Sequence, residues 1–545
     1  MAASPNRAEY ERTFASFRLE VPERFNFCRD VFDRWAENPD RVALWWVDDQ
    51  GHEARRTFAE LVEESRRACN LLTAQGIGRG DVVLVILPRL VEWWVINLAC
   101  LRMGAVVSPG TVQLSAKDIR HRADAAEAVC VIAGESVAST VDEALEESSA
   151  VKRRIVVGRR RPGWNTYHEL LSASSDEFET ADTRGDETAI LYFTSGTTGG
   201  PKMTAHTHAS YPLAHVITGK FWLDLTEQDV HWNLSDNGWA KAAWSSFYGP
   251  WHMGATIFVH HTDRFDPRRT LDLLAGYPIT SLCAAPTIYR MLVLEELAGF
   301  RFPALRSCVA AGEPLNPEII KRWREATGVT IRDGYGQTET VLLVGTFPCI
   351  EPRFGSMGMP APGFNVQVIG EAGEVVPDGA EGDMAVRVSP ERPVGLFQEY
   401  WKDPERTQAC YRGEWYVTGD RAIRDEDGYL WFVGRADDVI LSAAYRIGPF
   451  EVESALLEHD AVAESAVVAS PDELRGAVVK AFVVLAPGHE PSEELASELQ
   501  EHVKRLTAPY KYPRRIEFVA DLPKTVSGKI RRAELREREE RAAGL

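Results

Sequence analysis

The chain has 545 residues, which exceeds the size of one ordinary hydrophobic core, so we expect several domains. Its 45% hydrophobic and 26% charged residues are typical of a globular protein in water, and its net charge of -19 argues against nucleic acid as a partner. No apolar run is long enough to cross a membrane, so we expect no membrane span.

The eight cysteines form no CxxC pair and show no zinc-like spacing with histidine. Several of them, such as Cys100 and Cys308, lie in apolar runs where reduced, buried thiols are expected, and this fits a reducing compartment. The first residues carry Glu9, Glu11 and Glu20 and no apolar signal segment. The sequence therefore predicts a cytoplasmic protein.

The first part of the chain alternates strand and helix patterns. Residues 81–87 (DVVLVIL) indicate a buried strand, residues 91–102 a helix, and residues 129–133 and 154–158 two further short strands. The alternation starts again near residue 185, with apolar strands at 189–193, 256–260, 279–284 and 308–311. Strands separated by helices predict two α/β units with parallel sheets.

The pattern changes after residue 345. Strand-like segments at 366–369, 383–388, 415–417 and 429–433 follow one another with turns between them, which indicates a small β-barrel-like module. A polar break at 434–438 precedes a last unit of mixed helices and strands. We therefore predict an α/β protein with an N-terminal domain at 1–434, divided near 180 and 345, and a small α+β domain at 435–545.

Residues 194–202 (TSGTTGGPK) directly follow an apolar strand and concentrate Gly, Ser and Thr. Glycine allows close approach of the backbone to a ligand, and successive N–H groups with nearby hydroxyls and a lysine form an anion site. The segment lacks the GxxxxGK[ST] pattern of a Walker loop. We interpret it as a phosphate-binding loop, with a solvated turn as the alternative.

Other short motifs follow strands further along the chain. In Tyr335-Gly-Gln-Thr-Glu339, Glu339 suits magnesium, because a hard cation prefers carboxylate and phosphate oxygens. In Gly312-Glu-Pro314 the small residues allow a nucleobase to lie against the backbone, and Asp420 can accept both ribose hydroxyls. Lys529 ends a turn that can carry it into a site. Each motif alone is also compatible with a turn, a helix cap or a surface lysine.

Together the motifs are specific. They occur in the order TSGTTGGPK, AGEP, YGQTE, TGD, GRADD and PKTVSGK, and this series resembles the adenylate-forming (ANL) superfamily over residues 25–532. The segments SDNGW at 235–239, GSMG at 355–358, YRIGP at 445–449 and APYKYP at 508–513 resemble its medium-chain acyl-CoA synthetase branch. The resemblance implies an acid–CoA ligase that forms AMP and pyrophosphate, with a mobile C-terminal domain.

The resemblance also implies the ligands and their residues. The co-substrates are ATP, Mg²⁺, coenzyme A and an apolar carboxylic acid, and a homodimer is allowed. The catalytic residues are Lys529, Glu339, Thr338 and Lys202, with Glu339 as the metal ligand. The nucleotide residues are Thr194, Ser195, Gly196, Thr197, Thr198, Gly199, Gly312, Glu313, Pro314, Asp333, Gly334, Tyr335, Gly336, Gln337, Asp420 and Arg435.

The acid and the thiol are expected on other segments. Gly238, Trp239 and His206 are expected at the acyl pocket, where an apolar wall does not decide between an aliphatic chain and an aryl ring. The resemblance places the path of coenzyme A at Ala444, Tyr445 and Arg446, and the domain hinge at Asp437.

One position departs from the family pattern. Ala444 stands where the family generally has glycine. We therefore keep an alternative in which the adenylate forms but the acyl group passes slowly to coenzyme A or goes to an amine or a carrier protein. A catalytically inactive nucleotide-binding scaffold is disfavoured, because the charged residues of every motif are present.

Overall fold

The computed structural model contains two large sheets and describes residues 6–146, 150–194, 202–442, 445–472, 475–525 and 529–542. The nine-stranded sheet has the order β16-β15-β14-β13-β12-β10-β11-β1-β2. Its strands are β1 (Val42–Asp48), β2 (Glu53–Thr57), β10 (Val230–Asn233), β11 (Thr256–His261), β12 (Ser281–Ala284), β13 (Ser307–Ala311), β14 (Ile331–Tyr335), β15 (Val344–Gly345) and β16 (Met359–Pro360).

The eight-stranded sheet has the order β19-β9-β8-β4-β3-β5-β6-β7. Its strands are β3 (Val82–Ile86), β4 (Val106–Gly110), β5 (Cys130–Gly134), β6 (Arg153–Val157), β7 (Asn165–Thr166), β8 (Thr188–Thr194), β9 (Lys202–Thr207) and β19 (Glu399–Tyr400). The early strands β1 and β2 thus lie in the first sheet, and the later strands β8 and β9 in the second. The boundary expected near residue 180 separates two parts of the sequence, but each large sheet contains strands from both parts.

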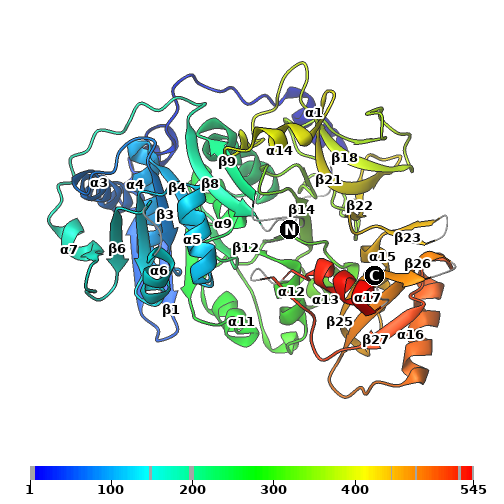
Figure 1. Cartoon of the computed structure of the whole chain (residues 1–545). Helices are drawn as coiled ribbons and strands as arrows, with labels where there is room; N and C mark the ends of the chain where they lie inside the picture. Colours follow the sequence, from blue (N-terminus) through cyan, green and yellow to red (C-terminus); the bar gives the residue numbers. More distant parts are fainter. Residues whose placement is uncertain are drawn as a thin grey trace.

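Helices accompany the strands of both sheets (Figure 1). They are α1 (Arg7–Ser16), α2 (Asp33–Trp35), α3 (Phe58–Ala74), α4 (Val91–Met103), α5 (Ala116–Ala125), α6 (Ala138–Leu145), α7 (Tyr167–Ser172), α8 (His215–Ile217), α9 (Ala240–Ser245), α10 (Tyr248–His252), α11 (Pro267–Gly276), α12 (Pro286–Val293), α13 (Pro317–Thr327) and α14 (Pro404–Ala409). Local signals fix their ends: Thr57 and Glu60 form a capping box on α3, and α4 stops at Gly104, whose φ is 75°.

A five-stranded antiparallel sheet follows, built from β17 (Val366–Ile369), β18 (Glu381–Arg387), β20 (Tyr411–Arg412), β21 (Trp415–Arg424) and β22 (Leu430–Arg435). The C-terminal lobe contains β23 (Ile440–Ser442), β24 (Tyr445–Ile447), α15 (Pro449–Leu457), β25 (Val462–Asp472), β26 (Gly476–Leu485), α16 (Glu493–Leu506), β27 (Arg515–Phe518) and α17 (Arg532–Ala542). Figure 1 shows this lobe at one end of the molecule, beside β22. The predicted fold class, a large α/β part followed by a small α+β part, is confirmed.

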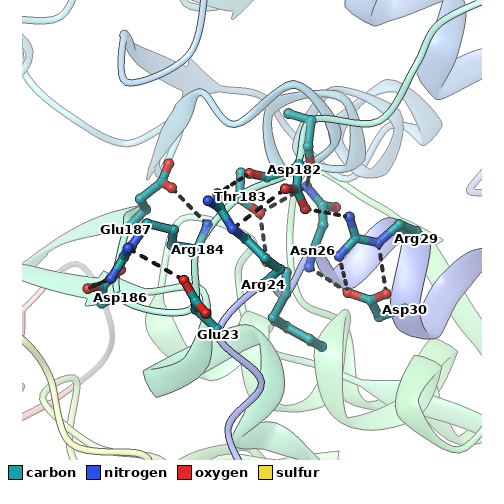
Figure 2. Close-up of polar contacts among 12 residues, drawn as sticks. Glu23, Arg24, Asn26, Arg29, Asp30, Asp182, Thr183, Arg184, Asp186 and Glu187 are labelled. Atoms are coloured by element: carbon teal, nitrogen blue, oxygen red, sulfur yellow. Dashed lines mark hydrogen bonds and ion pairs between the residues drawn. The ribbon is translucent and has the colours of Figure 1, made fainter.

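A polar cluster ties the segment before α2 to the segment before β8 (Figure 2). The buried Asn26 side chain donates to the Leu101 carbonyl at 2.8 Å and to Thr183 Oγ1 at 3.3 Å. Arg29 bridges Asp30 and Asp182 at 2.9 and 3.1 Å. Because Asn26 satisfies buried groups from two distant segments, it helps to hold the start of the chain against the large sheets. No helix in the described ranges has the length and apolar character of a membrane span.

Candidate active site

A cleft of about 2130 Å³ lies between the C-terminal lobe and the rest of the molecule. Strands from both large sheets and from the five-stranded sheet end at its walls, and the turn that carries Lys529 reaches it from the C-terminal lobe. In open α/β sheets, ligands bind outside the carboxyl ends of the strands, which is where most of the predicted motifs lie. We therefore describe the site along this cleft.

Where the sequence predicts nucleotide binding, the cleft walls are formed by the ends of β13 and β14. These strands run parallel, with Ala311 opposite Gly334, so Gly312-Glu-Pro314 and Tyr335 emerge side by side. Gly312 has a φ of 104°, a conformation that favours glycine. A methyl group on Gly334 would meet Trp222 at 2.4 Å, which explains why no side chain is tolerated there. Burial raises the pKa of Asp333 to about 8.

Asp420 lies at the centre of a hydrogen-bonded group. Tyr335 Oη donates to Asp420, and Gln337 Nε2 donates to the same carboxylate at 3.0 Å. Arg435 stands opposite Asp420 across β21 and β22, and its Nε lies 3.3 Å from Asp437. Burial raises the pKa of Asp420, and the hydrogen bond from Tyr335 and the charge of Arg435 oppose that rise. The structure thus brings residues from three separate motifs together.

Glu339 meets a tyrosine that the sequence motifs did not include. Tyr400 Oη donates to Glu339 Oε1 at 2.7 Å, and Lys202 Nζ lies 5.1 Å from the centre of the Tyr400 ring. Burial, followed by the charge of Glu339, raises the pKa of Tyr400, so this phenol stays protonated as a donor. Strand pairing brings Tyr400 here, because β19 pairs with β9, which begins at Lys202, and none of the sequence motifs indicated this contact.

The structure describes only the two ends of the predicted phosphate loop. Thr194 ends β8, Lys202 begins β9, and the two residues stand opposite each other in an antiparallel pair. Both line the cleft. Ser195, Gly196, Thr197, Thr198 and Gly199 lie outside the described residues.

The expected acyl segment crosses the end of another strand. A methyl group on Gly238 would meet the backbone nitrogen of Thr111 at 2.1 Å, so the backbone approach itself requires glycine here. The next residue, Trp239, lines the cleft. Lys241 lines it too, and its Nζ donates to the Ala311 carbonyl at 2.7 Å. Burial lowers the pKa of Lys241.

His206 is placed differently from the acyl residues. It is fully buried behind the cleft, and its Nε2 lies 2.7 Å from the Thr338 carbonyl. Burial lowers the pKa of His206 to about 3, so the ring is neutral and supports the backbone that carries Thr338 and Glu339. The structure therefore places Trp239 on the cleft wall, next to Gly238, and leaves His206 beneath that wall.

Lys529 comes from the C-terminal lobe. Its turn is closed by the bond from Thr525 N to the Lys529 carbonyl at 2.7 Å, and Lys529 lines the cleft. Asp420 and Lys241 line the same cleft, and the positive charge of Lys529 acts to lower the pKa of both. The base of the turn is fixed by Arg532, whose guanidinium donates to Glu453 at 2.7 Å.

The residues expected on the path of coenzyme A lie elsewhere. Tyr445 and Arg446 are exposed on β24, outside the cleft lining, and the Tyr445 ring stacks on Tyr510 at 4.2 Å. Ala444 lies outside the described residues. Asp437 lies in the turn between β22 and β23, where the five-stranded sheet passes into the C-terminal lobe. This arrangement brings Lys529 into the cleft and leaves β24 outside it.

The chain is similar to known proteins over most of its length. Residues 31–401 match the family AMP-binding enzyme, and residues 451–529 match the AMP-binding enzyme C-terminal domain. Acyl-coenzyme A synthetase ACSM3, mitochondrial, of Rattus norvegicus is 50% identical over 99% of this chain and 94% of its own. The corresponding ACSM4 of the same species is 50% identical over 95% and 91%. An anthranilate CoA ligase, AuaEII, in complex with anthranoyl-AMP has a TM-score of 0.89 and 29% identity, and the match covers 96% of this chain and 99% of that one.

The prediction of a cytoplasmic location is wrong by these comparisons, because the similar synthetases are named mitochondrial. The argument rested on reduced, buried cysteines, and the described structure holds six of the eight as buried thiols. Reduced thiols indicate a reducing environment without naming the compartment that provides it. That observation therefore never separated the cytoplasm from a mitochondrion.

Proposed function

We propose, from the premise that this chain belongs to the AMP-binding enzyme family, that it is an ATP-dependent acyl-CoA synthetase which activates a medium-chain fatty acid. A carboxylate oxygen of the acid attacks the α-phosphorus of ATP, the bond to the β-phosphate breaks, and pyrophosphate leaves. The thiol of coenzyme A then attacks the acyl carbonyl, loses its proton and displaces AMP. Both ATP and coenzyme A are substrates, and the products are acyl-CoA, AMP and pyrophosphate.

Positioning and charge stabilisation account for this chemistry, since neither step needs a covalent protein nucleophile. Lys529 bridges the acid carboxylate and the α-phosphate, two anions that repel each other without a cation between them. Lys202 and Thr194 hold the phosphates at the two ends of their loop. Asp420 and Arg435 hold the ribose, and adenine lies between Glu313 and Tyr335.

Magnesium fits this site through one protein carboxylate. No group of three or more His, Cys, Asp or Glu side chains in the described part of the chain is arranged to hold a metal. Mg²⁺ commonly takes one or two carboxylates plus substrate phosphates, and Glu339 is a carboxylate on the cleft wall beside Lys202. When bound, the metal would neutralise charge on the departing pyrophosphate.

The observation that carries the proposal is the delivery of Lys529 into the cleft that holds Lys202, Glu339 and Asp420. These four charged residues come from separate elements, and the proposed reaction uses all of them around one ATP molecule. The size of the acid follows from the similarity to the synthetases rather than from the cleft, and an aryl acid is the second candidate. The homodimer stays a prediction.

A panel of acids tests the proposal. We expect pyrophosphate release with medium-chain aliphatic acids, and acyl-CoA by mass spectrometry only when coenzyme A is present. Benzoate-like acids serve as the comparison. Pyrophosphate release without any thioester would instead favour the alternative acceptors. No pyrophosphate release with any acid would refute the proposal.

Ala444 has its own test within the same assay. If its methyl group narrows the thiol path, Ala444→Gly speeds thioester formation and leaves pyrophosphate exchange unchanged. An equal rate of acyl-CoA formation in both proteins would remove the case for a slowed second step.

A further inference from the structure

Lys202 and Glu339 carry opposite charges on the wall of the cleft, yet they do not pair. Lys202 begins β9, Glu339 lies shortly after β14, and both residues line the cleft. Within the described part of the chain neither side chain makes an ion pair, and the hydrogen bond to the Glu339 carboxylate comes from Tyr400. Because opposite charges in one cleft attract each other, something must keep this cation and this carboxylate apart.

Tyr400 contacts both charged groups with different parts of its side chain. Its Oη donates to Glu339 Oε1 at 2.7 Å, and Lys202 Nζ lies over its ring, 5.1 Å from the ring centre. The second distance is within the range of a cation–π contact. Tyr400 is 3% exposed and its ring packs on that of Phe397 at 4.9 Å, so the side chain has little freedom to leave this position.

Cys410 shows that both charges reach the place that Tyr400 occupies. Its Sγ lies 3.9 Å from Tyr400 Oη. Burial raises the pKa of this thiol, the charge of Lys202 opposes that rise, and the charge of Glu339 adds to it. Tyr400 therefore lies within reach of a cation and a carboxylate at once.

The backbone fixes Tyr400 from two sides. On one side β19 pairs with β9, and Trp401 N donates to the Met203 carbonyl at 2.7 Å. On the other side Phe397 N donates to the Glu339 carbonyl at 2.7 Å. The segment thus ties β9 to the turn after β14, and a slip of one residue in this pairing would turn the Tyr400 side chain to the opposite face.

A direct ion pair between Lys202 and Glu339 would occupy the cation that a phosphate needs and the carboxylate that Mg²⁺ needs. Tyrosine is neutral, so it can satisfy both groups without cancelling either charge. Its hydroxyl donates to the carboxylate, and the face of its ring attracts the ammonium group. Both charges are then left for a ligand.

We propose that Tyr400 is a positioning residue that keeps Lys202 and Glu339 apart and directed at the pyrophosphate part of ATP. This inference rests on the proposed function, because it needs Lys202 and Glu339 to act on the β- and γ-phosphates. Tyr400 acts through these two side chains, and binding of the AMP part of the nucleotide does not depend on it.

Calorimetric titration with ATP, pyrophosphate and AMP, each with Mg²⁺ and without acid or coenzyme A, tests the inference. Tyr400→Phe removes the hydroxyl and keeps the ring, so ATP and pyrophosphate should bind about tenfold more weakly, the size of one hydrogen bond to a charged group. Tyr400→Leu also removes the ring and lets Lys202 approach Glu339, so the loss should be greater. AMP should bind all three proteins within about twofold, because it lacks the β- and γ-phosphates.

Tyr429→Phe is the matched control. Tyr429 is also 3% exposed, its Oη donates to the Glu351 carbonyl at 2.8 Å, and it does not line the cleft. This variant loses the same atom from a buried tyrosine, and all three ligands should bind as in wild type. In a Lys202→Met background, Tyr400→Leu should weaken pyrophosphate binding less than it does in wild type, because a cation through which Tyr400 acts is already absent.

Two results would overturn the inference: unchanged affinity for pyrophosphate in both Tyr400 variants, or an equal loss for AMP and pyrophosphate, which indicates a structural role. The titrations do not require the catalysed reaction, so they separate the inference from the proposed function. A wild-type protein that binds pyrophosphate more tightly than Tyr400→Leu but forms no acyl-CoA would refute the proposed function and support the role of Tyr400. Equal binding by the two proteins would refute that role, whatever the activity.

Discussion

Asp333 shows how burial sets the charge of a single residue in the cleft. Its side chain is 7% exposed, and burial raises its pKa from 3.8 to about 8. Between these values the folded protein keeps a proton that the unfolded chain releases. The free energy of unfolding therefore falls as pH rises through this window, by at most about 1.4 kcal/mol per pH unit.

Asp333→Asn removes this dependence. The melting temperature of the variant minus that of wild type should increase between pH 5 and pH 8, because only the unfolded wild-type chain is stabilised by releasing this proton as pH rises. Thermal melts of both proteins across this range measure the difference. A difference that is the same at every pH would show that Asp333 ionises in the folded state at its ordinary pKa.

Lys529→Ala removes the cation that we place between the two reacting anions. ATP–pyrophosphate exchange should fall by about 100- to 1000-fold, the range for loss of one preorganised charge-stabilising group. Lys524→Ala is the matched control, because Lys524 lies on the same turn but pairs with Glu464 at 2.8 Å and does not line the cleft. Comparable exchange in both variants would remove Lys529 from the reaction.

At the scale of elements, the loop that carries Trp239 is fixed by its crossing with the end of β4. Gly238→Ala places a methyl group 2.1 Å from the Thr111 nitrogen, so the loop must shift. We expect a loss of stability of about 1–3 kcal/mol and a raised KM for the acid. Gly276→Ala, in α11 with open space around it, should be neutral or slightly stabilising. A Gly238→Ala protein with normal KM and stability would contradict this.

The turn of Lys529 depends on α15. Glu453 on this helix accepts bonds from Val467 N at 2.8 Å and from Arg532, and its side chain is 7% exposed. Glu453→Gln breaks a buried ion pair, which commonly costs about 3–5 kcal/mol, and should lower pyrophosphate exchange at least tenfold with little change in KM for ATP.

The neighbouring residue gives a control on the same helix. Glu451 pairs with Lys511 at the surface, and such pairs contribute about 0–1 kcal/mol, so Glu451→Gln should keep normal exchange. Melting of the C-terminal lobe and exchange rates are measured together. If Glu453→Gln melts lower but exchanges normally, the ion pair stabilises the lobe without positioning Lys529.

For the whole molecule, the sequence predicted what is local and missed what is distant. Motifs such as 335–339 lie at strand ends, as their composition indicated, because turn chemistry is encoded by neighbouring residues. The pairing of β1 with β11, over 200 residues away, and the contact of Tyr400 with Glu339 depend on tertiary packing. Neither the place of His206 in the sequence nor its residue type indicated that its side chain would be fully buried. The roles of the site residues remain predictions.

Long polar contacts and the packing of Phe432 against Phe450, whose ring centres lie 6.2 Å apart, join the C-terminal lobe to the rest of the molecule. Arg290 lies 3.9 Å from Glu464, and Asn316 Nδ2 lies 3.5 Å from the Ser454 carbonyl. Ion pairs of this length contribute little free energy to holding the two parts together. Arg536 pairs with Asp438 beside the turn that joins the five-stranded sheet to the C-terminal lobe.

In the present arrangement Lys529 lies inside the cleft, and Tyr445 and Arg446 lie outside it. A second arrangement is needed before Tyr445 and Arg446 can meet coenzyme A, and we propose that the lobe rotates at Asp437.

Asp437→Pro tests this rotation. Proline fixes φ, and the Asp437 N–H donates to no described group, so the present arrangement loses no hydrogen bond. Pyrophosphate exchange should stay within a few-fold of wild type, while acyl-CoA formation falls at least tenfold. Asp437→Ala removes only the side-chain contact with Arg435 at 3.3 Å and should preserve both steps. An equal loss of the two half-reactions in the proline variant would mean that the turn supports the site without acting as its hinge.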